Sequence, residues 1–200
     1  MEYYELLARR RMYRHFSRDP IPEIALQRIL DSATRGPSAG FTQGFDFLVL
    51  NESDALERFW DLALTQQWRD GTRSHQGLWN APVVVIPLAN PQAYLERYSE
   101  ADKSYSGLTR EHDWPVPYWF VDTAFASMLI LNSVVNENLG ALFFGLFRNV
   151  SEIKNSFKIP ERFIPIGAIA IGHPTSNDIS SSLRRGRRPR SSQFHMNRFQ

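Results

Sequence analysis

The stretch YWFVDTAFASMLILNSVVNENLGALFFG, residues 118–145, decides how the rest of the chain has to be arranged. Its first part, 118–139, has helical spacing and is apolar almost all round, which predicts a central helix buried by other elements. Gly140 is expected to end that helix, and LFFGLF at 142–147 is typical of a strand that follows it directly.

Three further strands are expected around this helix: FDFLVL at 45–50, APVVVIPLA at 81–89 and FIPIGAIAIG at 163–172. The consecutive Val83 to Ile86 suit a strand that is buried on both faces. Apolar residues with helical spacing predict further helices near 3–7, 24–33, 53–67, 91–99 and 151–157. No strand leads into GxGxxG or GxxxxGK[ST], so the pattern favours an α+β layer over a nucleotide-binding Rossmann or P-loop fold.

Composition excludes several classes of protein. With 42% hydrophobic residues among 200, the chain can build one core, and we expect a single domain over residues 1–200. The absence of cysteine excludes disulfide frameworks, iron–sulfur clusters and thiol catalysis. The five histidines show no metal-binding spacing, so we expect no metal site.

The sequence also predicts a soluble, cytoplasmic protein that is not bound to a membrane. The opening MEYYELLARR is charged and lacks the apolar core of a secretory signal. The longest apolar stretch, 118–135, is interrupted by Asp122, Asn132 and Ser133. We expect Asp122 to be a buried structural carboxylate that is bonded to backbone or to an arginine.

Both ends of the chain are basic, whereas the middle is acidic. Residues 1–18 hold five arginines, and residues 179–200 hold six arginines and no acidic residue. Guanidinium groups suit phosphate, so the two ends together predict an anion site. A solvated basic surface and a nucleic-acid-binding tail remain alternatives. The last residues, SSQFHMNRF at 191–199, are too apolar for a free tail and should dock on another surface.

Two glycine-containing segments allow a flat ligand to approach the backbone. Pro37 to Gly40 offer small residues and backbone N–H groups, with the Gln43 amide close behind. GALFFG at 140–145 places two glycines around the strand after the central helix. An ordinary helix-to-strand connection and a core strand are the alternatives for these two segments.

Together, these segments resemble a known family. RRMYRHF at 10–16, GPSAGFTQ at 36–43 and LGALFFG at 139–145 occur in the order seen in nitroreductase-like flavoproteins. AIGHP at 170–174 and RRGRRP at 184–189 are similar to the ending of that family. The resemblance implies an α+β fold with a central four-stranded, mostly antiparallel sheet. It also implies a homodimer with flavin mononucleotide (FMN) at the subunit interface and a basic C-terminal extension, 184–200, that reaches onto the partner.

Carried over by position, the resemblance assigns cofactor contacts. Arginines of both termini would hold the phosphate, Arg14 would lie near flavin N1 and O2, and Phe144 and Gly145 belong to the strand that faces flavin N5. The loop around Ser38 would line the ring from the partner subunit. The residues expected to bind the cofactor are Arg10, Arg11, Arg14, Pro37, Ser38, Ala39, Gly40, Gln43, Phe144, Gly145, Arg185 and Arg187.

The chain departs from the family pattern at several positions. Met12 stands where the family usually has Ser, Phe41 where it has Asn, and Gly44-Phe45 where it has Pro and a large aromatic. Phe41 would make the pocket more apolar and influence which acceptor fits. Residues 65–117 match no motif, and within them 100–117 is expected to be a mobile lid that carries Trp114 to the substrate.

The resemblance implies that NADH or NADPH delivers hydride to flavin N5, and that a nitroaromatic, quinone or similar small acceptor then takes it in a ping-pong cycle. No protein side chain would act as nucleophile or general base. Two alternatives remain. One is a specialised enzyme of this fold, such as a reductive dehalogenase or a deazaflavin-using reductase. The other is a non-catalytic protein that binds flavin or nucleic acid.

Overall fold

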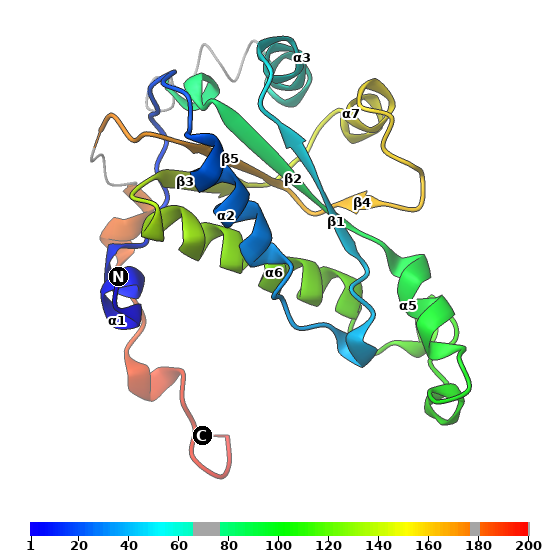
Figure 1. Ribbon diagram of the computed structural model, residues 1–200. Coiled ribbons are helices and arrows are strands. Elements are labelled where there is room, and N and C mark those ends of the chain that lie inside the picture. The colour runs from blue at the N-terminus through cyan, green and yellow to red at the C-terminus, as the bar shows by residue number, and fades with distance from the viewer. Residues whose placement is uncertain (66–76, 177–180, 200) are drawn as a thin grey trace.

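Five antiparallel strands form one open sheet in the computed structural model, which describes residues 1–65, 77–176 and 181–199 (Figure 1). The strands are β1 (Phe45–Leu50), β2 (Val83–Ala89), β3 (Gly140–Phe144), β4 (Ile164–Pro165) and β5 (Ala168–Gly172). Their order is β1-β2-β5-β3, and the short β4 pairs with the end of β2. The α+β prediction is therefore confirmed.

The sheet has one strand more than the four predicted, because the segment 163–172 forms two strands. Gly167 separates them with a φ of 154°, a conformation that side chains rarely adopt. A Cβ at Gly167 would lie 2.7 Å from the carbonyl oxygen of Phe144, so the close passage against β3 also requires glycine. The predicted strand 142–147 is shifted as well, since Gly140 begins β3 rather than ending the helix before it.

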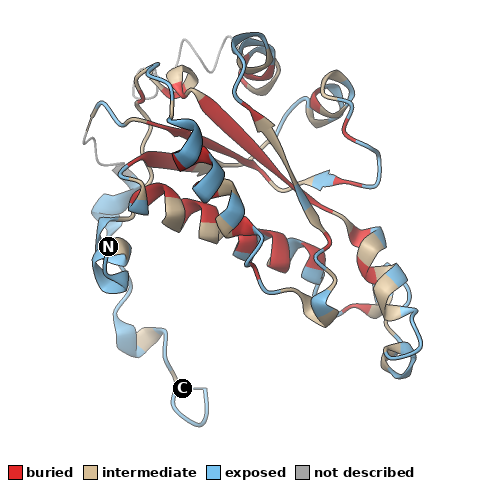
Figure 2. Cartoon of the chain, viewed as in Figure 1, coloured by how far each residue is buried: buried red, intermediate tan, exposed pale blue. Residues whose placement is uncertain are grey.

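Helices cover both faces of the sheet. The α-helices of the described residues are α1 (Tyr3–Arg9), α2 (Glu23–Ala33), α3 (Ser53–Ala63), α5 (Pro91–Tyr98), α6 (Tyr118–Asn136) and α7 (Val150–Ser156), and α2 and α6 cover one face while α3 and α7 cover the other. Val83 and Val85 of β2 pack in the cluster formed with α2 and α6. Val84 and Ile86 pack in the opposite cluster, with α3 and α7. The prediction that β2 is buried on both faces is confirmed, and Figure 2 shows this strand buried along its length.

The central helix is shorter than predicted, ending at Asn136 instead of 139. Asn138 adopts a left-handed φ of 57°, and the N–H of Leu139 donates to the carbonyl of Val134 (2.9 Å), which closes the helix end. Among the residues that the structure describes, α6 alone is long and apolar enough to cross a membrane, by length and composition only. It packs against α2 and β2 as a core helix.

Candidate functional site

The N-terminal arginines lie beside β3. Residues 10–16 leave α1 as an extended segment in which Met12 forms a bridge with Ala141, and the N–H of Tyr13 donates to the Ala141 carbonyl (2.9 Å). The Arg11 guanidinium lies 4.7 Å from the centre of the Tyr13 ring. Arg10, Arg11 and Arg14 are half-buried. The extended backbone therefore fixes three guanidinium groups along one edge of the sheet.

The segment that follows β5 pairs with the backbone just after these arginines. The N–H of Ser17 donates to the carbonyl of His173 (3.0 Å), and the N–H of Thr175 donates to that of His15 (3.1 Å). Beyond this pairing, Arg185 and Arg187 are exposed on an arm that extends away from the sheet and its helices (Figure 1).

At the end of β3, Phe144 and Gly145 differ in what they can offer a ligand. The Phe144 ring stacks on Trp60 (centroids 5.6 Å apart, 16° between planes), so its side chain belongs to the core. A Cβ at Gly145 would lie 2.3 Å from the Phe147 ring, which is itself 91% exposed. Only the backbone of Phe144 and Gly145 is therefore suited to a cofactor. Phe147 was missed by sequence reasoning, because 142–147 was expected to be a regular strand.

The small-residue loop before β1 has an unusual backbone. Gly40, Phe41 and Gln43 have φ of 62°, 54° and 52°, a region that residues other than glycine rarely adopt. The N–H of Gln43 donates to the Ser38 hydroxyl (2.9 Å), which closes the turn. The Phe41 side chain is 77% exposed. The loop thus holds an aromatic ring in solvent on a strained backbone.

A buried carboxylate lies behind this loop. Asp122, 2% exposed, accepts hydrogen bonds at Oδ2 from the Ala39 N–H and from the Tyr94 hydroxyl, both at 2.8 Å. Burial, together with the bond to Asp122, raises the pKa of Tyr94 far above its ordinary value. The prediction that Asp122 is a structural carboxylate bonded to backbone is confirmed.

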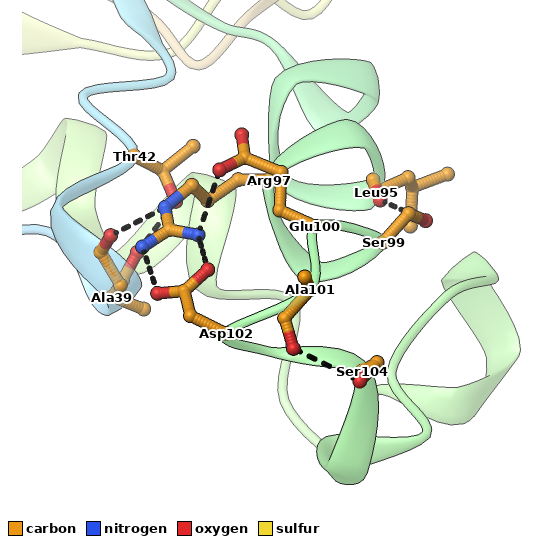
Figure 3. A network of polar contacts seen from close by, with 10 residues as sticks. Ala39, Thr42, Leu95, Arg97, Ser99, Glu100, Ala101, Asp102 and Ser104 are labelled. Atoms are coloured by element: carbon orange, nitrogen blue, oxygen red, sulfur yellow. Dashed lines mark hydrogen bonds and ion pairs between the residues drawn. The ribbon is translucent and has the colours of Figure 1, made fainter.

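An arginine of α5 holds the same loop from the other side. Figure 3 shows the Arg97 guanidinium between the loop that carries Ala39 and the carboxylate of Asp102. Its Nε donates to the Gly40 carbonyl (3.0 Å), and its two Nη atoms lie 2.7 Å from the Asp102 oxygens. The Asp102 hydrogen bond raises the pKa of Arg97, and the reciprocal bond from Arg97 lowers the pKa of Asp102. Sequence reasoning missed this network because 65–117 matches no motif.

Trp114, in the segment 100–117, is buried. Its ring packs edge-on against Tyr98 (centroids 4.7 Å apart), and its Nε1 donates to the Leu108 carbonyl (3.1 Å). With Ala39 and Tyr118, it lines a surface cavity of about 440 Å³. The sequence-predicted Trp114 and the predicted cofactor loop therefore border one cavity.

Two sets of the predicted cofactor residues, the loop at 37–43 and the N-terminal arginines, lie near opposite ends of α6. Ala39 is bonded to Asp122 near the start of α6, whereas Arg9 donates to Asn138 just beyond its end (Nη2 to Oδ1, 3.1 Å). The helix between Asp122 and Asn136 spans about 21 Å at a rise of about 1.5 Å per residue. One small ligand is thus not expected to reach the loop and the arginines of the same chain.

Comparison of the sequence with models of known protein families identifies the family of this chain. The sequence model of the Nitroreductase family matches residues 7–173. The chain belongs to the nitroreductase family. Membership makes it an oxidoreductase.

Individual relatives of this nitroreductase-family enzyme are distant. A Methanothermobacter thermautotrophicus protein provisionally named NADH dehydrogenase/NAD(P)H nitroreductase is 26% identical over 185 residues, covering 88% of this chain and 80% of its own length. The oxygen-insensitive NADPH nitroreductase of Salmonella typhimurium is 23% identical, and the match covers 86% of this chain and 66% of that protein.

Solved structures support the fold. A nitroreductase family protein from Clostridium difficile superposes with a TM-score of 0.74 at 17% identity, over the full length of both chains. A protein from Exiguobacterium sibiricum, solved in complex with FMN, gives a TM-score of 0.74 at 16% identity over 98% of this chain and 97% of that one.

Two departures from the family pattern have structural explanations. The Met12 side chain is half-buried and packs against both core clusters, so it belongs to the interior where the family pattern has a hydroxyl. A Cβ at Gly44 would lie 2.4 Å from the Tyr94 ring, so the ring occupies the space that the family pattern gives to proline. At both positions of this nitroreductase-family enzyme, the residue that differs from the family pattern allows apolar or aromatic packing in the interior.

Proposed function

We propose that the protein is a cytoplasmic, homodimeric, FMN-dependent oxidoreductase that uses NADH or NADPH to reduce nitroaromatics, quinones or similar small acceptors. The observation that carries the proposal is that the loop at 37–43 and the N-terminal arginines lie near opposite ends of α6, whose span from Asp122 to Asn136 is about 21 Å. In a pair of chains, the arginines of one and the loop at 37–43 of the other would complete each site.

The side chains present fit FMN by their chemistry. Arg10 and Arg11, with Arg185 and Arg187 of the C-terminal arm, supply guanidinium groups suited to a phosphate. Bound FMN would supply hydride transfer at its N5, first from the nicotinamide and then to the acceptor. Arg14 would hold a fixed positive charge beside the pyrimidine edge, which favours the reduced, more negative cofactor.

The other predicted residues would orient the ring. The backbone at Phe144 and Gly145 is suited to face one edge of the cofactor, because the Phe144 side chain points into the core. Pro37 to Gly40 and the Gln43 side chain of the second chain would lie against the ring. The exposed Phe41 ring beside them would exclude water and favour flat, apolar acceptors.

Two exposed apolar surfaces support the dimer. On α6, Tyr118 and Phe125 are exposed and, seven residues apart, share one face of the helix, and the Oδ1 of Asn132 is buried without a hydrogen-bond partner. On the C-terminal arm, the exposed large apolar side chains are Leu183, Phe194, Met196 and Phe199. Exposed apolar side chains that gather on one element are suited to contact a second copy of the chain. The C-terminal extension, 184–200, would then belong to a single domain and contact the partner chain.

The cavity beside the loop is the proposed acceptor site. It is lined by Trp114, Tyr98 and Ala39 and carries no charged lining residue. Aromatic walls favour a flat, uncharged ring, which agrees with nitroaromatics and quinones as acceptors. The segment 100–117, which contributes Trp114, would form one wall of this site and act as its lid.

The test is anaerobic titration of the purified protein with FMN, followed by NADH and by NADPH, with the molar mass in solution measured by light scattering. We expect a dimer with one FMN per chain. The absorbance of the bound FMN should bleach when either NADH or NADPH is added, and it should return when a quinone or nitroaromatic is added. A monomer that does not take up excess FMN would overturn the proposal.

The same panel separates the alternatives. Reduction only by a reduced deazaflavin, or turnover only of a halogenated aromatic, would identify the specialised enzyme. Colourless protein that binds nucleic acid with a steep salt dependence would identify the non-catalytic alternative.

A further inference from the structure

Two opposite charges hold neighbouring residues of the loop at 38–43. The buried carboxylate of Asp122, on α6, accepts the N–H of Ala39 at 2.8 Å. The guanidinium of Arg97, on α5, donates to the carbonyl of Gly40 at 3.0 Å (Figure 3). One side chain therefore fixes a backbone donor and the other a backbone acceptor, at adjacent residues.

These contacts act on residues whose backbone conformation is energetically unfavourable. Gly40 and Phe41 both have left-handed φ, and such conformations persist only when surrounding contacts hold them. The Phe41 ring is largely exposed, so its own packing provides little hold. A Cβ at Gly40 would lie 2.9 Å from the Tyr98 ring, which supports the turn from beneath. The contacts from α5 and α6 therefore add to the bond between Gln43 and Ser38 within the loop.

Arg97 is itself held in place by the residues after α5. Asp102 binds both of its Nη atoms at 2.7 Å, and Glu100 contacts Nη1 at 3.1 Å. This fork-to-fork pairing leaves Nε directed at Gly40, and only 23% of the Arg97 side chain is exposed. The start of the 100–117 segment is thus connected to the loop through one guanidinium group.

We propose that Arg97 and Asp122 are positioning residues that hold the loop so that Phe41 is presented to the acceptor, and that Asp102 keeps Arg97 in position. The inference rests on the proposed function, in which this loop lines the cofactor of the partner chain. It assigns acceptor selectivity partly to residues that do not contact the acceptor.

The first measurement is hydrogen exchange of the cofactor-free protein in Arg97→Met, Asp122→Asn and Lys154→Met. Lys154 is a matched control, because on α7 it also donates to a carbonyl and pairs with a carboxylate, both of Glu161 at 3.0 Å. In the first two variants, we expect amides of 38–43 to exchange about tenfold faster, with β2 unchanged. The Lys154→Met protein should match wild type.

The second measurement is steady-state kinetics of the FMN-loaded enzyme with a quinone. Arg97→Met should raise the acceptor KM about fivefold or more while kcat stays within about twofold. Arg97→Lys should rescue little, because one ammonium cannot bind the carbonyl and both Asp102 oxygens in the same geometry.

The two measurements can fail separately. Loop exchange in Arg97→Met equal to that in Lys154→Met would overturn the positioning role, even if Asp122→Asn does not fold. Faster exchange without a change in acceptor KM would overturn the assignment to acceptor selectivity. Failure of wild type to bind FMN would overturn the proposed function, and the exchange result would still decide whether the loop is held.

Discussion

Replacing Tyr94 with phenylalanine removes the hydroxyl group from a buried polar contact. The Tyr94 side chain is fully buried, and its hydroxyl donates to Asp122 at 2.8 Å. A hydrogen bond to a charged group contributes about 1.5–3 kcal/mol, so we expect Tyr94→Phe to lower the free energy of unfolding by about 2 kcal/mol at pH 7. For a chain of this length, that corresponds to a fall in Tm of about 4–8 °C.

The assay is denaturant unfolding at fixed protein concentration, with Tyr105→Phe as the control because that tyrosine is exposed. In an Asp122→Asn background, Tyr94→Phe should cost less than in wild type, because the carboxylate acceptor is no longer charged. A Tyr94→Phe protein within about 0.5 kcal/mol of Tyr105→Phe would refute the reasoning, since surface changes alone stay within that range.

The same contact predicts a dependence on pH. Burial raises the pKa of Tyr94 in the folded protein, whereas the unfolded chain retains the ordinary tyrosine value of about 10. Above that value the unfolded state loses a proton that the folded state keeps, so ionisation favours unfolding. The stability advantage of wild type over Tyr94→Phe should therefore shrink as the pH rises from about 9 to 11. An advantage that stays constant over this range would contradict the shift.

Three further changes test other parts of the structure. Arg14→Ala should lower the reduction potential of bound flavin in a spectroelectrochemical titration, because a positive charge near the reduced ring is lost; Arg58→Ala, on α3, is the control and should leave the potential unchanged. Phe125→Asp should convert the dimer to monomer in light scattering and abolish FMN binding, since that ring is exposed on α6; a dimer that persists would place the interface elsewhere. Gly44→Ala should destabilise the protein by about 1–3 kcal/mol in denaturant unfolding, because the new methyl group meets the Tyr94 ring; unchanged stability would show that the ring moves aside freely.

The sequence predicts the layers of the fold well because hydrophobic periodicity reports burial directly. The run Val83 to Ile86 identified a strand buried on both faces, and the apolar stretch from Tyr118 identified the central helix. Boundaries were less accurate. The break at Gly167 depends on the close passage of β3, a segment distant in sequence. The left-handed turn at Asn138 is a local helix ending, which helical periodicity alone does not locate.

Short motifs indicated which residues are involved in the candidate site, but not how they are supported. The arginines after α1 and the loop around Ser38 carry recognisable residue types, whereas their separation along α6 appears only in three dimensions. Arg97 and Tyr94 were not predicted, because an arginine or tyrosine on a short amphipathic helix usually faces solvent or core without further consequence. Their roles depend on which backbone groups of the loop come within hydrogen-bonding distance.

The departure from the family pattern at Gly44 and the buried carboxylate belong to one physical arrangement. Glycine at 44 leaves room for the Tyr94 ring, whose nearest carbon lies 2.4 Å from the ideal Cβ position. That ring brings a hydroxyl into the core, where an unpaired hydroxyl is costly, and Asp122 accepts its hydrogen bond. A buried carboxylate in turn requires more than one donor, and the N–H of Ala39 also donates to Asp122. The contacts from Gly44 through Tyr94 and Asp122 therefore end at the loop proposed to face the flavin, so the packing around Gly44 is linked to the backbone of that loop.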